Sequence, residues 1–412
     1  MTITEMGARA KEAARVLATA GALKEAALLH AAHALWSRRE EILAANAQDL
    51  EAGKGAGLSQ ALLDRLALTE GRIQDMKTAV EEVAKAADPV GRALSGETRP
   101  NGLRIEKVAV PLGVIGIIYE ARPNVTSDAA ALCLKAGNAV ILRGGKEAIR
   151  SNKAVAGVLR DALEEAGLPA DCVQLVEDTS RQSAQELMGL TQYLDVLIPR
   201  GGAGLIRSVK ENARVPVIET GVGNCHVYVD ASADLDMAAE IIYNAKCSRP
   251  SVCNAIETIL VHQDAAKAAL PKIKARLDEK QVELRGCDRA RAILPGITPA
   301  VEEDWATEYL DYILAVKVVG SLEEALGHIA RYSTGHSECI VTQDYTAAQR
   351  FLNEVDAAAV YVNASTRFTD GGQFGLGAEI GISTQKLHAR GPMGLEQLVS
   401  YKFLIRGSGQ VR

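Results

Sequence analysis

Aromatic residues are scarce in this sequence: Phe, Trp and Tyr together make up 4% of its 412 residues. So few rings cannot supply the stacking platforms with which proteins hold single-stranded nucleic acid. Neither charge sign dominates, because 46 basic residues face 52 acidic ones and the net charge is −6. This balance predicts neither a polyanion-binding surface nor an acidic tail. We therefore expect no nucleic-acid partner.

Long apolar runs are also missing. The most apolar stretch, residues 108–118, is far shorter than the roughly 20 residues of a membrane helix and contains Pro111 and Gly113. Residues 1–12 have no apolar core behind a basic flank, so no signal peptide is predicted. The seven cysteines are scattered and odd in number, which argues against a disulfide framework and favours a reducing compartment. We expect a cytoplasmic protein without membrane association.

The sequence also lacks the spacings of a metal site. His328 and His336 flank Tyr332–Gly335, but no third ligand lies at a useful distance along the chain and no CxxC pair is present. A catalytic acid or a local hydrogen bond is a better role for either histidine, and a purely structural one is better still. No GxSxG motif is present to support a Ser-His-Asp triad. We expect no metal.

The residues that are abundant predict an α/β protein of more than one part, since 412 residues exceed what one core usually supports. Residues 8–50 and 60–87 are rich in Ala, Leu, Glu, Lys and Arg, which predicts helices. Beyond residue 105, apolar runs alternate with helical stretches, which is typical of a parallel sheet that binds ligands at the carboxyl ends of its strands. We expect strands at 108–118, 139–142, 173–176, 196–198 and 215–218, with helices at 147–166 and 204–212.

A second α/β set follows Gly223. We expect its strands at 226–229, 256–261, 314–319, 339–342 and 358–362, and its helices at 236–245, 265–280, 322–330 and 346–354. Residues 101–108 and 398–405 have the pattern of accessory strands, which tend to pair with another subunit or to be covered. The pattern therefore predicts two parallel-sheet layers and a small β element for oligomerisation.

Cys253 is the first candidate for chemistry. It lies in the loop Arg249-Pro-Ser-Val-Cys-Asn-Ala255, between a predicted helix and a predicted strand. Small neighbours suit a nucleophile that the substrate must approach closely, and its thiolate would need nearby N–H groups to hold an oxyanion. The alternative is a buried structural cysteine, which is the commoner fate of a free thiol. Spacing alone does not decide between them.

Two glycine-rich turns are candidate phosphate sites. Gly144-Gly145-Lys146 follows one predicted strand and precedes a helix, where backbone N–H groups and the ammonium could hold phosphate. Arg200-Gly201-Gly202 repeats the arrangement after the strand at 196–198. Neither is the GxGxxG fingerprint or a P-loop, so each is a weak signal alone.

Together these motifs form a known order. Pro111–Gly116, Gly137-Asn138, Glu219–Gly221 and Cys253 follow one another as in the aldehyde dehydrogenase superfamily. Within it, the chain resembles the gamma-glutamyl phosphate reductase family over nearly its whole length. The matching runs are Tyr119–Val125, Ile198–Gly202, Arg249–Asn254 and a signature made of Val319, Ala325-Leu326, His328-Ile329, Tyr332–Thr334, His336–Glu338 and Ile340.

The resemblance implies an aldehyde dehydrogenase-like fold. It implies a cofactor domain in 1–223 with an accessory strand near 101–108, a catalytic domain in 224–362, and a return to the cofactor domain with an oligomerisation tail in 363–412. The implied reaction is the NADPH-dependent reduction of L-glutamyl 5-phosphate to L-glutamate 5-semialdehyde through a Cys253 thioester, in proline synthesis. A homo-oligomer and functional coupling to glutamate 5-kinase are further implications.

Residue roles follow from the same resemblance. Arg143 matches a superfamily lysine, and Lys146 stands where the superfamily has a glutamate that addresses the ribose. An ammonium there would attract a 2′-phosphate, which favours NADPH over NADH. Glu308 matches the glutamate that touches the nicotinamide ribose, and Asn124 is a candidate oxyanion donor. Further expected site residues are Gly144, Gly145, Gly201 and Gly202 for the cofactor, and Arg122, Arg200, Arg249 and Arg367 for the substrate.

Some interpretations stay open at this point. Glu219 matches the residue that activates water in aldehyde oxidation, a role that a reductase does not need. An ordinary or CoA-acylating aldehyde dehydrogenase would share the fold and the cysteine, although the runs around Arg122, Arg200 and Arg249 argue against it. A nucleotide-binding scaffold without activity is a third hypothesis, and the intact Cys253 loop argues against that.

Overall fold

The computed structural model describes residues 1–412, except for the side chain of residue 61. The chain divides into two compact units. The first contains residues 1–220, 375–381 and 393–412, and the second contains residues 221–374 and 382–392. The first division falls between Thr220 and Gly221, close to the predicted end of the cofactor domain at 223. The functions assigned to these parts stay predictions.

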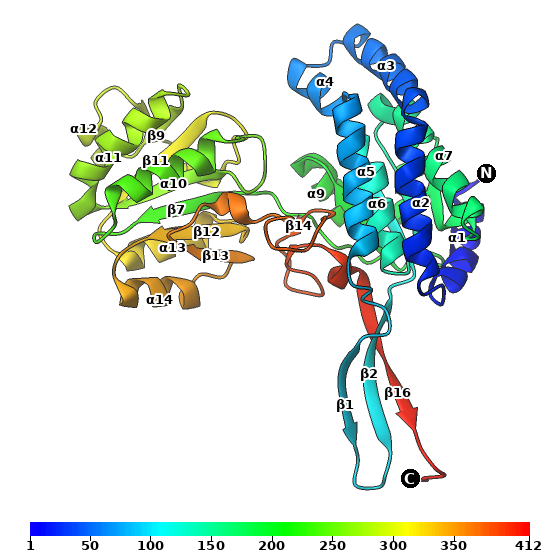
Figure 1. Cartoon of the computed structure of the whole chain (residues 1–412). Helices are drawn as coiled ribbons and strands as arrows, with labels where there is room; N and C mark the ends of the chain where they lie inside the picture. The colour runs from blue at the N-terminus through cyan, green and yellow to red at the C-terminus, as the bar shows by residue number, and fades with distance from the viewer. The chain divides into compact units, whose positions relative to one another are not determined.

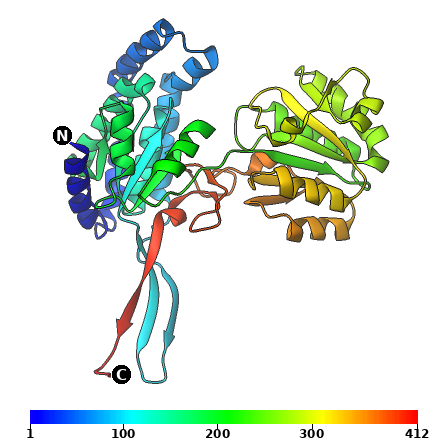
Figure 2. The same cartoon turned by 180° about the vertical axis from the view of Figure 1, so that it is seen from behind.

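The first unit is built on a four-stranded parallel sheet in the order β5-β4-β3-β6. Its strands are β3 (Val114–Tyr119), β4 (Ala139–Arg143), β5 (Val173–Leu175) and β6 (Val196–Arg200). All six residues of β3 are buried, because helices cover both faces of the sheet (Figures 1 and 2). These helices include α6 (Asn124–Lys135), α7 (Ile149–Glu165), α8 (Arg181–Met188) and α9 (Ala203–Asn212).

The N-terminal region differs from the prediction. The single helix expected at 8–50 is three helices, α1 (Ile3–Leu17), α2 (Leu23–Ser37) and α3 (Arg39–Gly55). Gly21 separates the first two with a φ of +53°, a conformation that ends a helix and suits glycine. The helix expected at 60–87 is likewise divided into α4 (Gln60–Leu66) and α5 (Glu70–Lys85), because Thr69 caps the second helix.

The strand expected at 108–118 was also wrong. It is two strands in different sheets, β2 (Arg104–Pro111) and β3, which Gly113 separates with a φ of +127°. A side chain at Gly113 would overlap the Asp195 carboxylate, so the turn requires glycine for two reasons. The strand expected at 215–218 is absent, and only one bridge, between Leu197 and Val217, replaces it.

β2 belongs to a three-stranded antiparallel sheet in the order β1-β2-β16, with β1 (Ala93–Thr98) and β16 (Val399–Arg406) at its edges. The accessory strands expected at 101–108 and 398–405 correspond to β2 and β16. Figure 1 shows this sheet extending away from α2 and α5 of the same unit. Tyr401 and Phe403 are exposed on it and pack edge to face, with ring centroids 5.9 Å apart.

The second unit contains a seven-stranded parallel sheet in the order β10-β9-β11-β8-β7-β12-β13. The five expected strands are present as β7 (Cys225–Val229), β8 (Ile256–His262), β11 (Ile313–Val319), β12 (Ser337–Val341) and β13 (Ala359–Val362). Two strands were not predicted, β9 (Glu283–Gly286) and, beside it at the edge of the sheet, β10 (Thr298–Pro299). The helices α10 (Leu235–Cys247), α11 (Gln263–Asp278), α13 (Leu322–Tyr332) and α14 (Tyr345–Glu354) match their predictions within two residues, and a short α12 (Asp288–Ile293) was missed.

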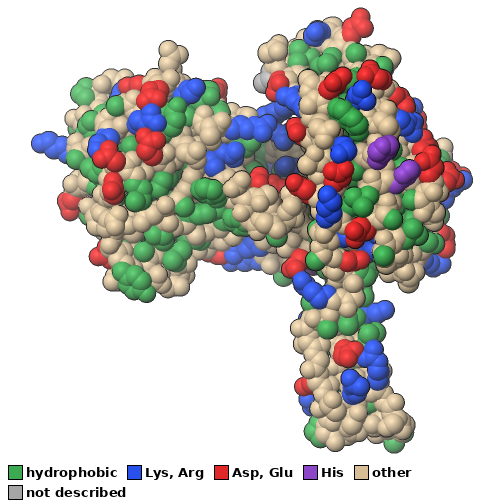
Figure 3. Space-filling view, in the orientation of Figure 1, with side chains coloured by type: hydrophobic (Ala, Val, Ile, Leu, Met, Phe, Trp, Pro, Cys, Tyr) green, Lys and Arg blue, Asp and Glu red, His purple; other side chains and the backbone are tan. Residues whose placement is uncertain are grey.

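The surface of the first unit carries side chains of both charge signs. On the face of the first unit that Figure 3 shows, basic and acidic side chains are interspersed over the helices without a block of one sign. None of the helices among the described residues combines the length and the apolarity that a bilayer crossing needs.

Candidate functional site

Cys253 lies in the loop between α10 and β8, at the amino end of β8. The amino end of β7 is its neighbour, because Cys225 pairs with Ile256 across the two strands. Among the seven cysteines only Cys253 and Cys287 are partly exposed. Burial raises the pKa of the other five thiols, and Cys287 accepts a hydrogen bond from the Val318 N–H at 3.4 Å. Cys253 and Cys287 are thus the two thiols that a substrate could reach, and Cys253 is the one in the predicted catalytic loop.

The backbone of this loop is fixed from the β7 side. Gly223 packs so closely on it that a Cβ there would overlap the carbonyl oxygen of Cys253. The Cys225 thiol donates a hydrogen bond to the same carbonyl oxygen at 3.2 Å. The Gly223 N–H in turn donates to Glu308 Oε1 at 2.8 Å, and burial raises the pKa of Glu308. Cys253 and Glu308 were predicted from the sequence, whereas the connection between them through Gly223 was not.

Asn254 fixes the other side of the loop. Its side-chain amide nitrogen donates to the backbone carbonyl oxygen of Thr369 at 3.0 Å. Its backbone carbonyl oxygen accepts a hydrogen bond from the Thr366 hydroxyl at 2.7 Å. Arg367, an expected substrate ligand, donates to the Asn254 side chain and, at 3.0 Å, to Ser248 Oγ. Arg367 therefore has a structural role, because its hydrogen bonds to Asn254 and Ser248 stabilise the loop that carries Cys253.

Two guanidinium groups, one of which interacts electrostatically with Cys253, belong to this part of the second unit. Burial lowers the pKa of Arg367, and the neighbouring charge of Arg249 lowers it further, whereas Asp370 and Cys253 raise it. Arg249 is exposed. Cationic neighbours stabilise a thiolate and attract anionic substrates. Arg249 and Arg367 are thus the two predicted substrate arginines that the structure brings together with Cys253.

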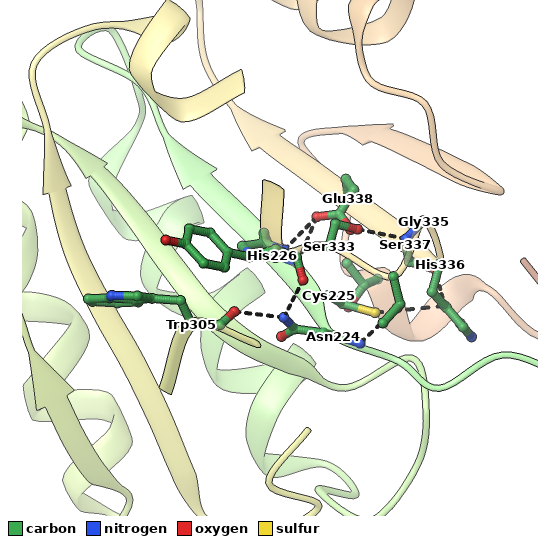
Figure 4. A network of polar contacts seen from close by, with 12 residues as sticks. Asn224, Cys225, His226, Trp305, Ser333, Gly335, His336, Ser337 and Glu338 are labelled. Carbon is green, nitrogen blue, oxygen red and sulfur yellow. Dashed lines mark hydrogen bonds and ion pairs between the residues drawn. The ribbon is translucent and has the colours of Figure 1, made fainter. Parts of the chain in front are cut away.

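Behind the loop lies a buried polar network, which Figure 4 shows. The Glu338 carboxylate accepts the backbone N–H of His226 at 2.9 Å, contacts His226 Nδ1 at 3.0 Å and accepts the Ser333 hydroxyl at 2.5 Å. Asn224 donates to the carbonyl oxygens of Trp305 and Tyr332, at 2.8 Å each. These contacts fix the segment at the amino end of β7, which includes Gly223 and Cys225, the two residues that contact the Cys253 carbonyl group.

His328 and His336 both belong to this buried region. Burial lowers the pKa of His328 to about 3 and that of His336 to about 4, so both rings are neutral near pH 7. His328 Nδ1 lies 3.1 Å from Lys317 Nζ, and His336 Nδ1 lies 2.8 Å from Ser337 Oγ. In the described part of the chain no group of His, Cys, Asp or Glu side chains is arranged to hold a metal ion.

In the first unit, the Gly144-Gly145-Lys146 turn follows the carboxyl end of β4, as the sequence predicts. A Cβ at Gly144 would overlap the Asn152 amide, so the backbone is tightly packed there. Lys146 is exposed. The Arg143 guanidinium is instead used locally, because it donates to the carbonyl oxygens of Thr179 and Ser180 at 2.7 and 2.9 Å, and burial lowers its pKa.

The second glycine turn contacts the Glu120 side chain, for which the sequence predicted no role. Glu120 Oε2 accepts the Gly202 N–H at 2.8 Å, and a Cβ at Gly201 would lie 2.6 Å from the same oxygen. This N–H at the start of α9 is thus already used. Arg200 immediately precedes the turn and is half-buried.

The start of α6 holds the remaining candidates. Asn124 is its first residue, and its amide donates to Asp128 Oδ2 at 2.9 Å. Burial raises the pKa of Asp128 to about 6. Arg122 lies just before this helix and is half-buried, while Glu219 forms an ion pair with Lys210 at 3.0 Å. Asp128 was missed, although its spacing of four residues from Asn124 places both on one helix face.

Comparison with known proteins agrees with this geometry. Residues 2–303 match the model of the aldehyde dehydrogenase family. The gamma-glutamyl phosphate reductase of Moorella thermoacetica is 63% identical over 100% of this chain and 99% of that protein. The protein of the same name from Heliobacterium modesticaldum is 61% identical over 98% of each chain. The crystal structure of gamma-glutamyl phosphate reductase from Thermotoga maritima is 52% identical, with a TM-score of 0.97 and 99% of each chain covered. The chain therefore belongs to the gamma-glutamyl phosphate reductases, within the aldehyde dehydrogenase family.

Proposed function

We propose that this chain catalyses the NADPH-dependent reduction of L-glutamyl 5-phosphate to L-glutamate 5-semialdehyde and phosphate, the second step of proline synthesis from glutamate. The observation that carries the proposal is the setting of Cys253, which is partly exposed and interacts electrostatically with Arg367, an arginine on which the charge of Arg249 also acts. The name that the relatives bear, at up to 63% identity, supports the choice of acyl phosphate.

In the proposed first step the Cys253 thiolate attacks the acyl carbon. A C–S bond forms, the bond from the acyl carbon to the phosphate oxygen breaks, and phosphate leaves with the electron pair. Arg249 and Arg367 would favour the thiolate and balance the charge of the departing phosphate. A thioester accepts hydride more readily than a carboxylate does, so two moderate barriers replace one high barrier.

Asn124 stays our candidate for the oxyanion donor. Its amide carries two N–H groups, and the hydrogen bond to Asp128 uses one of them. The second could donate to an acyl oxygen. Collapse of the reduced adduct would then expel the Cys253 thiolate and give the aldehyde. Glu219 is held by Lys210 and has no part in this sequence of steps.

The residues at the end of β4 suit a phosphorylated dinucleotide. Lys146 is exposed at the carboxyl edge of a parallel sheet, where an ammonium can meet a 2′-phosphate. Gly144 and Gly145, which precede it in the turn, belong to the proposed cofactor set. Gly201, Gly202 and Glu308 complete the proposed cofactor set. A bound NADPH would supply the hydride that reduces the thioester.

We also propose a homo-oligomer, a cytoplasmic location and functional coupling to glutamate 5-kinase. The oligomer is supported by the exposed side chains Tyr401, Phe403 and Ile405 on the edge strand β16, because open edge strands with apolar side chains are usually paired or covered.

The deciding experiment is turnover in the oxidative direction. Purified protein supplied with glutamate 5-semialdehyde and NADP+ should produce NADPH only when phosphate is present. Coenzyme A in place of phosphate should give no turnover. Phosphate-independent or CoA-dependent NADPH formation would refute the proposal in favour of an ordinary or CoA-acylating aldehyde dehydrogenase, and no turnover under any condition would favour the inactive scaffold.

A further inference from the structure

Asp128 lies on α6, one turn after Asn124, and its side chain is only partly exposed. Its carboxylate accepts the Asn124 amide at 2.9 Å and the Ser127 hydroxyl at 3.3 Å, both from its own helix. Within the described residues it forms no ion pair. A partly buried carboxylate without a cation is costly, and burial accordingly raises the pKa of this group to about 6.

Other partly or fully buried carboxylates of the same unit are bound differently. Asp195 accepts the Lys11 ammonium at 2.9 Å and the backbone N–H of Val114 at 2.8 Å. Asp49 accepts both the N–H and the hydroxyl of Ser151, at 2.8 and 2.7 Å. Each of these carboxylates connects separate elements of the fold. Asp128 connects nothing beyond its own helix, so its place in the site is not explained by a structural role.

Arg200 carries a complementary charge that acts on Asp128. It is the last residue of β6, which pairs with β3, and α6 begins shortly after β3 ends. Both side chains therefore belong to the carboxyl edge of the sheet, where α/β proteins bind ligands. The charge of Arg200 acts on Asp128, yet the two are not in hydrogen-bonding contact, and a Cβ at Gly381 would lie 3.4 Å from the Arg200 side chain.

A carboxylate and a guanidinium that are close but not joined fit a ligand with both charges on one carbon. An α-amino acid has that chemistry, with an ammonium and a carboxylate on the α-carbon. We propose that Asp128 and Arg200 form the subsite for the α-amino acid head group, with the ammonium on Asp128 and the α-carboxylate on Arg200. This inference rests on the proposed function, which supplies a substrate with such a head group.

The test compares two aldehydes that differ only in the α-amino group, glutamate 5-semialdehyde and 5-oxopentanoate, with phosphate and NADP+. The wild type should prefer the amino compound in kcat/KM. Asp128→Asn should lower this preference ten- to hundredfold, as expected when one charged hydrogen-bonded partner is lost. Asp161→Asn, which removes an exposed carboxylate from α7 of the same unit, is the matched control and should leave the preference unchanged.

An Asp128→Asn variant that slows both aldehydes equally would show a structural role and refute the subsite. If the variant does not fold, the wild type provides the test, because protonation of Asp128 removes its charge. The KM for the amino compound, relative to that for 5-oxopentanoate, should then rise as the pH falls below about 6. Arg200 is the charged group that acts on Asp128 from another element, β6. A ratio that does not change would overturn the proposal.

Failure of the proposed function can be told apart from failure of this inference. If the wild type shows no phosphate-dependent turnover, calorimetric titration with L-glutamate and with glutarate replaces the kinetic comparison. Wild-type protein should bind L-glutamate at least tenfold more tightly than glutarate, and Asp128→Asn should remove the difference. Equal binding of the two acids by the wild type would refute the head-group subsite independently of the reaction.

Discussion

Acidification should destabilise this protein through its two buried, neutral histidines. Burial lowers the pKa of His336 to about 4 and that of His328 to about 3, whereas an unfolded histidine titrates near 6.5. Between these values the unfolded state binds more protons than the folded one. The stabilisation by each neutral ring is therefore fully present above about pH 6.5 and is lost as the pH falls below that value. Below the folded pKa the free energy of unfolding no longer changes through this group.

The magnitude follows from the same values. One pKa unit corresponds to about 1.4 kcal/mol, and pH 5 lies roughly 1.5 units below the unfolded value, so each histidine should cost about 2 kcal/mol at pH 5. Carboxyl groups act in the opposite direction, because burial raises the pKa of Glu257 to about 7 and that of Asp128 to about 6. The pH dependence of the wild-type stability alone therefore does not test the histidine contribution. The test is the difference in pH dependence between the wild type and a histidine variant.

Urea unfolding at pH 7 and pH 5 can be followed by the fluorescence of Trp305, whose ring centroid lies 5.5 Å from that of His328. A Trp36→Phe background leaves it as the only tryptophan of the chain. Between pH 7 and pH 5, the free energy of unfolding of His336→Asn should fall by about 2 kcal/mol less than that of the wild type. His30→Asn, at an exposed ion pair with Glu165, is the control and should follow the wild type. Parallel pH dependence in the wild type and His336→Asn would refute the reasoning.

Four further outcomes are expected. Cys253→Ala should abolish turnover while NADPH still binds, as fluorescence titration would show; substantial remaining activity would exclude the thioester. Lys146→Glu should weaken the binding free energy of NADPH by a few kcal/mol and leave the Kd of NADH nearly unchanged, since a charge-assisted contact is replaced by a repulsion. Equal effects on the Kd values of both cofactors would contradict the 2′-phosphate contact. Gly223→Ala should lower kcat at least a hundredfold with little loss of thermal stability, because the added methyl group displaces the Cys253 carbonyl; wild-type kcat would show that the loop tolerates the shift. Arg249→Ala should raise the KM for phosphate about tenfold or more, and an unchanged KM would remove this exposed side chain from the anion site.

The sequence was most informative where a strand is apolar along its whole length. β8 and β11 were predicted within one residue, because continuous buried runs such as Ile256–Val261 leave few alternatives. The stretch at 108–118 is equally apolar, yet it contains a reversal at Gly113 that depends on the position of Asp195. A contact with a residue so far along the chain leaves no mark in a local pattern.

The candidate site also contains residues that a local sequence pattern predicts and residues that only contacts within the fold identify. Cys253, the glycine turns and the arginines were predicted because motifs in a fixed order pointed to them. Glu120, Gly223 and Asp128 were not, because their roles arise from neighbours that only the fold supplies. Arg143 and Arg367 show the converse, since the residue type suggests a ligand while the structure shows hydrogen bonds to the protein itself.

The pairing of β2 with β16 has a consequence for the order in which the protein matures. During synthesis β1 and β2 emerge early, but a two-stranded hairpin is marginally stable in water. Its third strand, Val399–Arg406, is synthesised only after the strands of both parallel sheets. The antiparallel sheet therefore cannot close while those sheets are being translated, and it closes by a contact between distant segments that is slow to form. Any assembly that uses this sheet would then select chains that already contain both parallel sheets.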